Sequence, residues 1–229
     1  KVDVAGLKKA VDGFDGFSIV YFVNPNNPTS TVTPASEIEL WVKSKPDNTL
    51  FIADEAYAEY VSDPNFKSMA NLIQDGLDNV VLLKTFSKLY AMAGMRVGFA
   101  VGAPAIIKMM KDQVAGEKLN YPGVTAALVS LDDEPFQEYS RASNLESRKI
   151  LASCFDKLGV KYLPSSTNFM FFELNEPIHA FQKKMAARNI LVGRPFPPAM
   201  TWCRISLGTP QEMAYVANEL TKMRAEGVF

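Results

Sequence analysis

At 229 residues, with 48% hydrophobic and 21% charged residues, the chain has the composition of a folded globular protein. Its formal net charge of −1 gives no basis for proposing a nucleic acid or an anionic membrane as a partner. No apolar run approaches the roughly 20 residues that a membrane-spanning helix needs. The two cysteines, Cys154 and Cys203, lack metal-ligand spacing and fit a reducing compartment as well as any other. We therefore expect a cytoplasmic protein without a metal site, although the sequence leaves a disulfide between them open.

The first part of the chain alternates between helix and strand patterns. Apolar residues at helical spacing predict a helix over residues 3–13, and the continuous apolar run 17–23 predicts a buried strand. A loop with two prolines and three asparagines follows, from Asn24 to Ser30. Its composition fits a simple turn, but loops after parallel strands are also where α/β proteins place ligands.

A second helix–strand pair follows this loop. The pattern predicts a helix from Pro34 to Lys45, a strand over 49–53 and a further helix over 65–76. Asp54 stands at the carboxyl end of that strand, where a carboxylate could pair with a ligand's ring nitrogen or simply cap a helix. Tyr57 follows three residues later and could donate a hydrogen bond to the same ligand.

The stretch 85–99 places two hydroxyls, a lysine and an arginine directly after a predicted strand, over 80–83. Hydroxyls and an arginine suit a phosphate group, because they donate directed hydrogen bonds and a fixed positive charge. A lysine such as Lys88 can form a Schiff base with an aldehyde when its amine is neutral. Pyridoxal 5'-phosphate (PLP) carries both a phosphate and an aldehyde. The alternative is an exposed lysine and arginine beside a turn.

Three segments together resemble the fold-type I PLP enzymes of aminotransferase class I/II. They are Asn24-Pro25-Asn26-Asn27-Pro28-Thr29-Ser30, Asp54-x-x-Tyr57 and Thr85-x-Ser87-Lys88-x5-Gly94-x-Arg96-x-Gly98. They occur in the family's order and at similar spacing. Ser30 replaces the family's usual glycine, so we expect some backbone strain there if the position needs a positive φ.

The resemblance implies a set of site residues. Lys88 would be the catalytic residue, and the cofactor would be held by Asn27, Asp54, Tyr57, Thr85, Ser87, Lys88 and Arg96. In the family, the equivalents of Asn27 and Tyr57 contact the cofactor's ring oxygen. The aspartate pairs with the ring nitrogen, and the hydroxyls and the arginine hold the phosphate. Glu55 and Glu59 match no such role, and we expect them to be solvated.

The strand and helix patterns predict an α/β fold in which helices flank a mainly parallel sheet with right-handed crossovers. A strand is expected over 99–102, a helix from Pro104 to about Lys111, a turn over 120–123 and a helix after that turn to about Leu131. A polar helix over 135–157 is expected to leave this domain. Residues 1–135 would form part of the large, PLP-binding domain.

Residues 136–229 are expected to form a smaller α+β domain. Its predicted strands and helices cover 167–172, 177–189, 190–192, 202–207 and 210–224.

Three residues of this domain are candidate substrate ligands. Arg204 lies inside a predicted apolar strand, where an arginine without a partner would be costly. The run 202–209 resembles the family segment whose arginine binds the substrate α-carboxylate, although an internal salt bridge is the alternative. Asn168 matches a family asparagine near the substrate. Arg194 would bind a second anionic group, or else be a solvated loop residue.

The resemblance also implies a function. Family members are longer, and this chain, which does not begin with methionine, is expected to lack their N-terminal third. We expect PLP-dependent transamination between a small-molecule amino donor (an amino acid or amino-phosphate) and a 2-oxo acid, by a homodimer most similar to histidinol-phosphate aminotransferases. The alternatives are a decarboxylase of the threonine-phosphate type, an aromatic aminotransferase, and a non-catalytic PLP-fold module.

Overall fold

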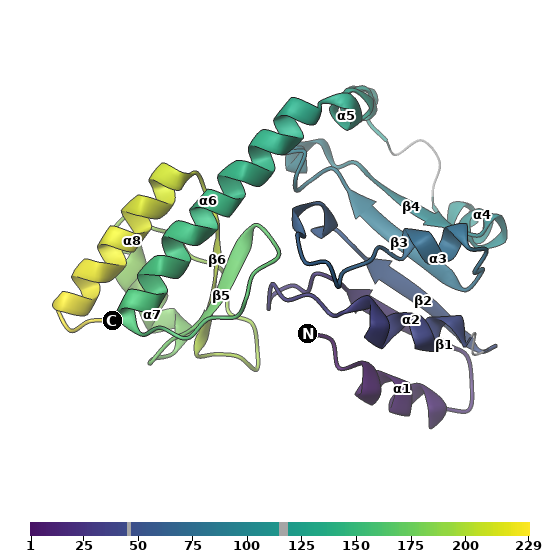
Figure 1. Ribbon diagram of the computed structural model, residues 1–229, viewed down its shortest axis with the longest axis horizontal. Coiled ribbons are helices and arrows are strands. Elements are labelled where there is room, and N and C mark those ends of the chain that lie inside the picture. The colour runs from purple at the N-terminus through teal and green to yellow at the C-terminus, as the bar shows by residue number, and fades with distance from the viewer. Residues whose placement is uncertain (45–46, 115–118) are drawn as a thin grey trace. The chain divides into compact units, whose positions relative to one another are not determined.

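The computed structural model describes residues 1–44, 47–114 and 119–229 (Figure 1). They form two compact units. The first comprises Lys1–Asn27 and Val32–Phe136, and the second comprises Pro28–Thr31 and Gln137–Phe229. The short segment Pro28–Thr31 thus belongs to the second unit, although the chain on either side of it belongs to the first.

A four-stranded sheet in the order β1-β2-β3-β4 is the frame of the first unit. Its strands are β1 (Ser18–Val23), β2 (Thr49–Asp54), β3 (Val80–Thr85) and β4 (Gly98–Gly102). The first three run parallel, and β4 runs antiparallel to β3. The expected α/β fold with a mainly parallel sheet is confirmed. Because β1, β2 and β3 are parallel, their carboxyl ends lie at the same edge.

Three helices pack on one face of this sheet: α1 (Val4–Asp12), α2 (Ala35–Lys43) and α3 (Ala70–Gln74). The core between them is aromatic. The rings of Phe22 and Phe51 stack with centroids 6.0 Å apart, and Trp41 meets Phe51 edge-on at 5.0 Å. The predicted helix over 34–45 corresponds to α2, with Pro34 as its N-cap. Its predicted end at Lys45 lies outside the described residues.

The predicted helix over 65–76 is too long. Only Ala70–Gln74 is helical, and the preceding residues follow an irregular path. The reason is a competing hydrogen-bond acceptor. The backbone N–H of Met69 and the hydroxyl of Ser68 both donate to the Glu55 carboxylate, each at 2.7 Å. Met69 therefore marks the start of the helix.

The turn predicted over 120–123 is also wrong, because helix α5 (Tyr121–Asp132) begins there. Asn120 caps the helix by accepting a hydrogen bond from the N–H of Gly123 at 2.6 Å, and Pro122 lies in the first turn, where proline is tolerated. The same residues that suggest a turn therefore start a helix. Helix α4 (Pro104–Gln113) precedes this element, as expected.

The other face of the sheet carries exposed apolar side chains, among them Ile19 and Tyr21 of β1. Side chains alternate between the two faces of a strand, and Tyr21 therefore projects on the same side as Val23. Since Val23 lies opposite Asp54 in the parallel register, Asp54 points to this face as well. The face opposite the packed core thus carries Asp54, a candidate site residue.

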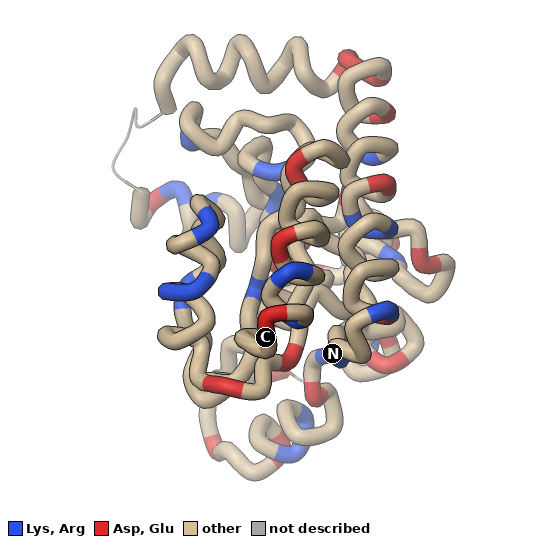
Figure 2. The backbone as a smooth tube through the Cα atoms, turned by 90° about the vertical axis from the view of Figure 1, so that its left-hand side faces the viewer, with Lys and Arg blue, Asp and Glu red and all other residues tan. Residues whose placement is uncertain are grey.

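The second unit packs three helices around a two-stranded antiparallel sheet. Its elements are α6 (Glu134–Leu158, in this unit from Gln137 onward), β5 (Phe169–Glu173), α7 (Ile178–Ala186), β6 (Trp202–Ser206) and α8 (Pro210–Ala225). Leu151, Phe155, Phe172, Phe181 and Leu220 are fully buried in one core that joins all three helices to β5. Helix α6 carries acidic and basic residues interspersed along its length (Figure 2).

Two strand predictions in this unit need correction. Residues 190–192 do not form a strand, and the side chain of Leu191 is exposed. Strand β5 begins at Phe169 rather than at Thr167. The hydroxyl of Thr167 donates to the Phe169 carbonyl at 3.0 Å and so forms a local turn before the strand.

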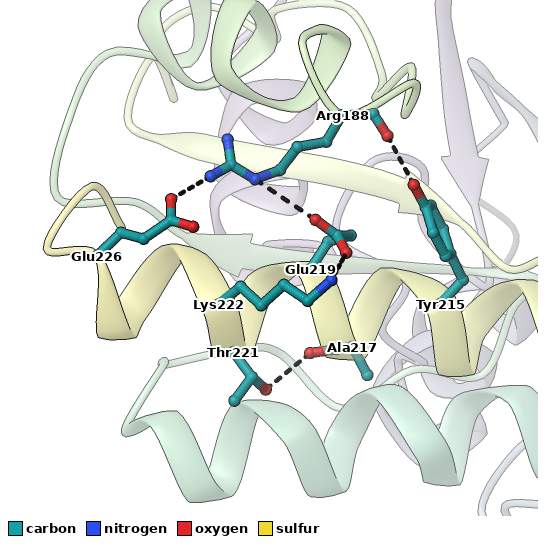
Figure 3. Close-up of polar contacts among 7 residues, drawn as sticks. All are labelled: Arg188, Tyr215, Ala217, Glu219, Thr221, Lys222 and Glu226. Atoms are coloured by element: carbon teal, nitrogen blue, oxygen red, sulfur yellow. Dashed lines mark hydrogen bonds and ion pairs between the residues drawn. The ribbon is translucent and has the colours of Figure 1, made fainter.

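Polar contacts join the residue Arg188, just after α7, to helix α8 and its C-terminal end (Figure 3). Arg188 forms ion pairs with Glu219 and Glu226, and its backbone carbonyl accepts a hydrogen bond from the Tyr215 hydroxyl at 3.1 Å. Lys222 adds a contact of 2.6 Å to Glu219. These contacts give the chain after α7 a fixed path into the following loop.

In the part of the chain that the structure describes, no helix has the length and apolar character to cross a membrane. Likewise, no group of three or more His, Cys, Asp or Glu side chains among these residues is arranged to hold a metal ion. Both cysteines are buried and free.

Candidate active site

The loop after β1 is closed by Asn24, a residue that the sequence pattern did not single out. Its side-chain amide donates to the Thr33 carbonyl at 3.0 Å, and its oxygen accepts from the Thr33 N–H at 2.8 Å. Both bonds are buried, so they fix the two ends of the loop to each other. Asn27 lies within this loop and is exposed.

Ser30, in the same loop, has a φ of 62° and is fully buried. Position 30 therefore has the positive φ for which the family usually has glycine, and a serine adopts it here. Its hydroxyl donates to the Thr29 carbonyl at 2.5 Å. This local bond offsets part of the strain of a residue with a Cβ in that conformation.

Asp54, the last residue of β2, is oriented by two donors. The Tyr21 hydroxyl donates to its Oδ2 at 2.6 Å, and the Ala56 N–H donates to its Oδ1 at 3.0 Å. Partial burial and, after it, the hydrogen bond to Asp54 raise the pKa of Tyr21 to about 12. Tyr21 therefore stays a hydrogen-bond donor through the neutral range. No sequence pattern indicates this contact, because it depends on the register of β1 against β2.

Tyr57 and Lys88 lie close together although they follow different strands. Tyr57 is buried, and the Lys88 Nζ lies 5.2 Å from the centroid of its ring. A cation at this distance from an aromatic face is attracted by the ring's quadrupole. The loops after β2 and β3 thus bring a phenol and an amine into one place.

The loop that carries Lys88 is held at its base by main-chain bonds. The N–H of Phe86 donates to Val97, and the N–H of Met92 donates to Phe86, both at 3.1 Å. Phe86 itself packs in a small cluster with Val97 and Ala127 of α5. Thr85 contributes its hydroxyl oxygen, which accepts from the Ser87 N–H at 3.0 Å. Lys88 and Ser87 therefore project from a loop with a fixed base.

Arg96 ends this loop in a left-handed conformation, with a φ of 55°. It is exposed, and its guanidinium donates to the Ala93 carbonyl at 2.9 Å. The chain then enters β4 at Gly98, where a Cβ would lie only 2.7 Å from the carbonyl oxygen of Lys84. Glycine is needed at that position because the two strands approach so closely.

The expectation that Glu55 is solvated is wrong, since its side chain is only 2% exposed. It accepts the Ser68 and Met69 donors described above and lies 3.7 Å from the Lys84 Nζ. Lys84 also pairs with Glu59 at 2.6 Å. Burial raises the pKa of Glu55, although these partners oppose the shift. The three charges link the β2 and β3 ends on the core side of the sheet.

The second unit holds the three remaining candidates. Arg204 lies on β6, and its guanidinium carbon Cζ is 5.0 Å from the ring centroids of both Phe169 and Phe196. Arg194 is exposed, with its Cζ 4.4 Å from the same Phe196 ring. Asn168 precedes β5, and its carbonyl accepts from the Leu207 N–H at 2.9 Å. The two arginines thus share one aromatic neighbour.

The described residues of the first unit can bind a ligand with several polar groups. They bring a carboxylate, a phenol and an amine, with nearby hydroxyls and a guanidinium, to the edge where three parallel strands end. A model of the family described as "Aminotransferase class I and II" matches residues 1–220. The chain belongs to this family.

Sequence relatives support this membership. The chain is 34% identical over 211 residues to a histidinol-phosphate aminotransferase of Granulibacter bethesdensis, covering 91% of this chain and 57% of that protein. It is 32% identical over 196 residues to the enzyme of the same name from Moorella thermoacetica, covering 85% of the chain and 50% of that protein. The chain thus spans between half and three fifths of the length of these relatives.

Solved structures agree with the fold of this aminotransferase-family chain. A protein of Erwinia carotovora atroseptica, designated a candidate histidinol-phosphate aminotransferase, superposes with a TM-score of 0.97 at 54% identity, covering 99% of this chain and 66% of that one. The histidinol-phosphate aminotransferase of Sinorhizobium meliloti, solved in complex with PLP, superposes with a TM-score of 0.87 at 27% identity, covering 98% and 61%.

The donor set of the first unit fits the chemistry of that cofactor. The oriented Asp54 carboxylate can accept from a protonated ring nitrogen, and Lys88 supplies a primary amine. The hydroxyls of Thr85 and Ser87 and the exposed Arg96 guanidinium are donors of the kind that phosphate groups require.

Proposed function

We propose that this chain is part of a PLP-dependent aminotransferase of the histidinol-phosphate type, which transfers an amino group between an amino donor and a 2-oxo acid. The observation that carries the proposal is the shared edge of the sheet. Three groups lie there at the ends of parallel strands or just after them, in the order found in the family: Asn27, Asp54 with Tyr57, and Thr85 with Ser87 and Lys88. The named relatives support the substrate class.

PLP, when bound, supplies an aldehyde that condenses with amines and a ring that withdraws electrons from the substrate's Cα. In this proposal Lys88 would hold the cofactor through Nζ, and the same amine would take a proton from the substrate's Cα and later return one. Tyr57, whose ring lies beside Lys88, orients this amine.

The other residues of the site bind and orient. Asp54 accepts from the ring nitrogen while Tyr21 and Ala56 hold its carboxylate in place. Asn27 and Tyr57 would donate to the ring oxygen, and Thr85, Ser87 and Arg96 would hold the phosphate. In the second unit, Arg204 binds the substrate's anionic group, Asn168 lies near the substrate, and Arg194 binds a second anionic group.

The experiment that tests this proposal uses the complete protein loaded with PLP. Borohydride reduction followed by peptide mapping should place the cofactor on Lys88, and L-histidinol phosphate with 2-oxoglutarate should yield glutamate. Lys88→Ala should lower turnover by roughly a thousandfold or more. Lys111→Ala, at an exposed lysine on α4, serves as the control and should leave turnover unchanged.

The outcomes separate the alternatives. With threonine phosphate as the substrate, which has a carboxylate on Cα, release of carbon dioxide in place of a keto product would assign the protein to the decarboxylases. Reduction that labels Lys88 without turnover of any donor would indicate a non-catalytic module. Full activity in Lys88→Ala would rule out the proposed mechanism.

We also infer a cytoplasmic homodimer. Two observations support it: the described cysteines are free, as in a reducing compartment, and the apolar side chains of Tyr121, Leu128 and Val129 on α5 are exposed. Light scattering of the complete protein, which should give twice the mass of one chain, tests the dimer, and cell fractionation tests the compartment.

A further inference from the structure

The two candidate anion ligands of the second unit are held against one ring. The Cζ atom of Arg194 lies 4.4 Å from the centroid of Phe196, and that of Arg204 lies 5.0 Å from it. Phe196 is buried, and it packs edge-on against Phe171 of β5 at 6.2 Å. Two cations near one ring repel each other, and an anion that pairs with both would relieve that repulsion.

The backbone of Gly193, near this ring, is hydrogen-bonded to β6. The Gly193 N–H donates to the carbonyl oxygen of Arg204 at 3.0 Å. A Cβ at Gly193 would lie 2.5 Å from the same oxygen, so only glycine fits. This bond fixes the residue directly before Arg194 against the residue that carries the other guanidinium.

The carbonyl group of Gly193 is hydrogen-bonded to a side chain of helix α7. The Gln182 side chain donates from Nε2 to the Gly193 carbonyl at 2.9 Å. Its Oε1 lies 3.2 Å from His179 Nδ1, one turn earlier on the helix, which limits the rotation of the amide. The helix is rigidly placed, because Ile178, Phe181 and Met185 are all fully buried. Gln182 therefore fixes the loop at Gly193 relative to the packed helix α7.

We propose that Gln182 is a positioning residue that holds Arg194 alongside Arg204, and that it thereby sets the affinity for amino donors carrying a phosphate group. This inference rests on the proposed function, in which the arginine pair binds the substrate's anionic groups. Gln182 touches no substrate in this scheme. It acts through the Gly193 carbonyl, and its loss lets Arg194 leave Phe196 without disturbing Lys88 or its neighbours.

The test compares kinetic constants of the complete PLP-loaded protein with L-histidinol phosphate as donor. Gln182→Met keeps the length of the side chain and removes its hydrogen bonds. We expect KM to rise roughly fivefold, the worth of one hydrogen bond, with kcat within about twofold of wild type. Gln211→Met, the same change at an exposed position on α8, should leave both constants unchanged.

A double-mutant cycle distinguishes positioning from a general structural effect. In an Arg194→Ala background, Gln182→Met should raise KM by less than about twofold further, because its target is gone. If Gln182→Met does not fold, Gln182→Glu, which retains the chain length but lacks the donor, provides the same comparison.

An unchanged KM in Gln182→Met would overturn the inference, as would an equal loss in the Arg194→Ala background. A wild-type protein that transaminates only donors without a phosphate would overturn it as well, while leaving transamination standing. A wild-type protein that binds PLP but turns over no donor would overturn the proposed function, and this inference with it.

Discussion

The Tyr21 hydroxyl donates a 2.6 Å hydrogen bond to the carboxylate of Asp54, across the first two strands of the sheet. Asp54 can therefore be oriented before any ligand arrives. A group held in its binding geometry does not have to be ordered on binding, which favours affinity.

Replacing this tyrosine should weaken cofactor binding. Tyr21→Phe removes one of the two donors to Asp54, and we expect the Kd for PLP in the complete protein to rise roughly three- to tenfold. The measurement is an absorbance titration of the apoprotein. Tyr162→Phe is a matched control, because the Tyr162 hydroxyl also donates to an aspartate, Asp156 at 3.1 Å, in the second unit. Equal Kd values for wild type and Tyr21→Phe would show that the bond does not orient the site.

Replacing Ser30 by glycine should change the stability little, whereas replacing it by a β-branched residue should lower it. Its φ of 62° is unfavourable for any residue with a Cβ, and most of all for a branched one. Ser30→Gly removes that strain but also loses a local hydrogen bond and adds unfolded-state entropy. The free energy of unfolding should therefore stay within about 1 kcal/mol of wild type. Ser30→Val should lower it by about 2 kcal/mol or more. Urea unfolding measures both, and similar stabilities for the two variants would contradict the argument.

Glu55 should make stability depend on pH in an unusual direction for an acid. Burial raises its pKa above the ordinary value of 4.5, so the folded state binds the proton more tightly than the unfolded state. The stability that this provides is fully present below the unfolded-state pKa and is lost as the pH rises through the folded-state pKa.

The measurement is the free energy of unfolding of wild type and Glu55→Gln across the pH range. Wild type should lose stability relative to the variant as the pH rises above about 4.5. Glu146→Gln, at an exposed position on α6, should differ from wild type by a constant amount. A wild type that gains stability relative to Glu55→Gln as the pH rises would contradict the expected sign.

The cysteines of this chain should be unreactive until the protein unfolds. Both are buried, and burial raises the pKa of the Cys154 and Cys203 thiols, so little nucleophilic thiolate forms near pH 8. Iodoacetamide followed by mass mapping should label neither peptide in the native protein and both in denaturant. Rapid native labelling of Cys203 would show that the core of the second unit opens readily.

The sequence could predict the strands of the first unit because each is a short apolar run that ends in polar or turn residues. Asp54, Tyr57 and Lys88 stand out in the sequence because each follows such a run, in a recognisable order. Tyr21, which donates to Asp54, does not stand out, since their contact arises only from the pairing of β1 with β2 in one register.

The errors at residues 65–69 and at Glu55 have one physical cause, which is competition between local and long-range hydrogen-bond partners. Residues 65–69 have a helical pattern, but the Glu55 carboxylate takes the N–H of Met69 and the hydroxyl of Ser68. Glu55 looks solvated in sequence and is buried, because three groups distant in the chain supply its hydrogen bonds and counter-charge. Residues 190–192 have the composition of a strand, but Ile190 and Val192 pack on the core of the second unit without forming one. Local pattern cannot anticipate such outcomes.

The segment Pro28–Thr31 has a further consequence for how the protein is assembled. Ser30 of this segment contacts the carbonyl of Pro164, 134 positions away, within the second unit. Closing a flexible loop of that length costs about 4 kcal/mol of chain entropy. The two units are therefore interleaved rather than consecutive. A fragment that starts at Gln137 lacks a piece of its own unit, so the second unit cannot be obtained complete by a single cut in the gene. During synthesis, the segment Pro28–Thr31 can form its contacts with the second unit only after more than a hundred later residues have been added to the chain.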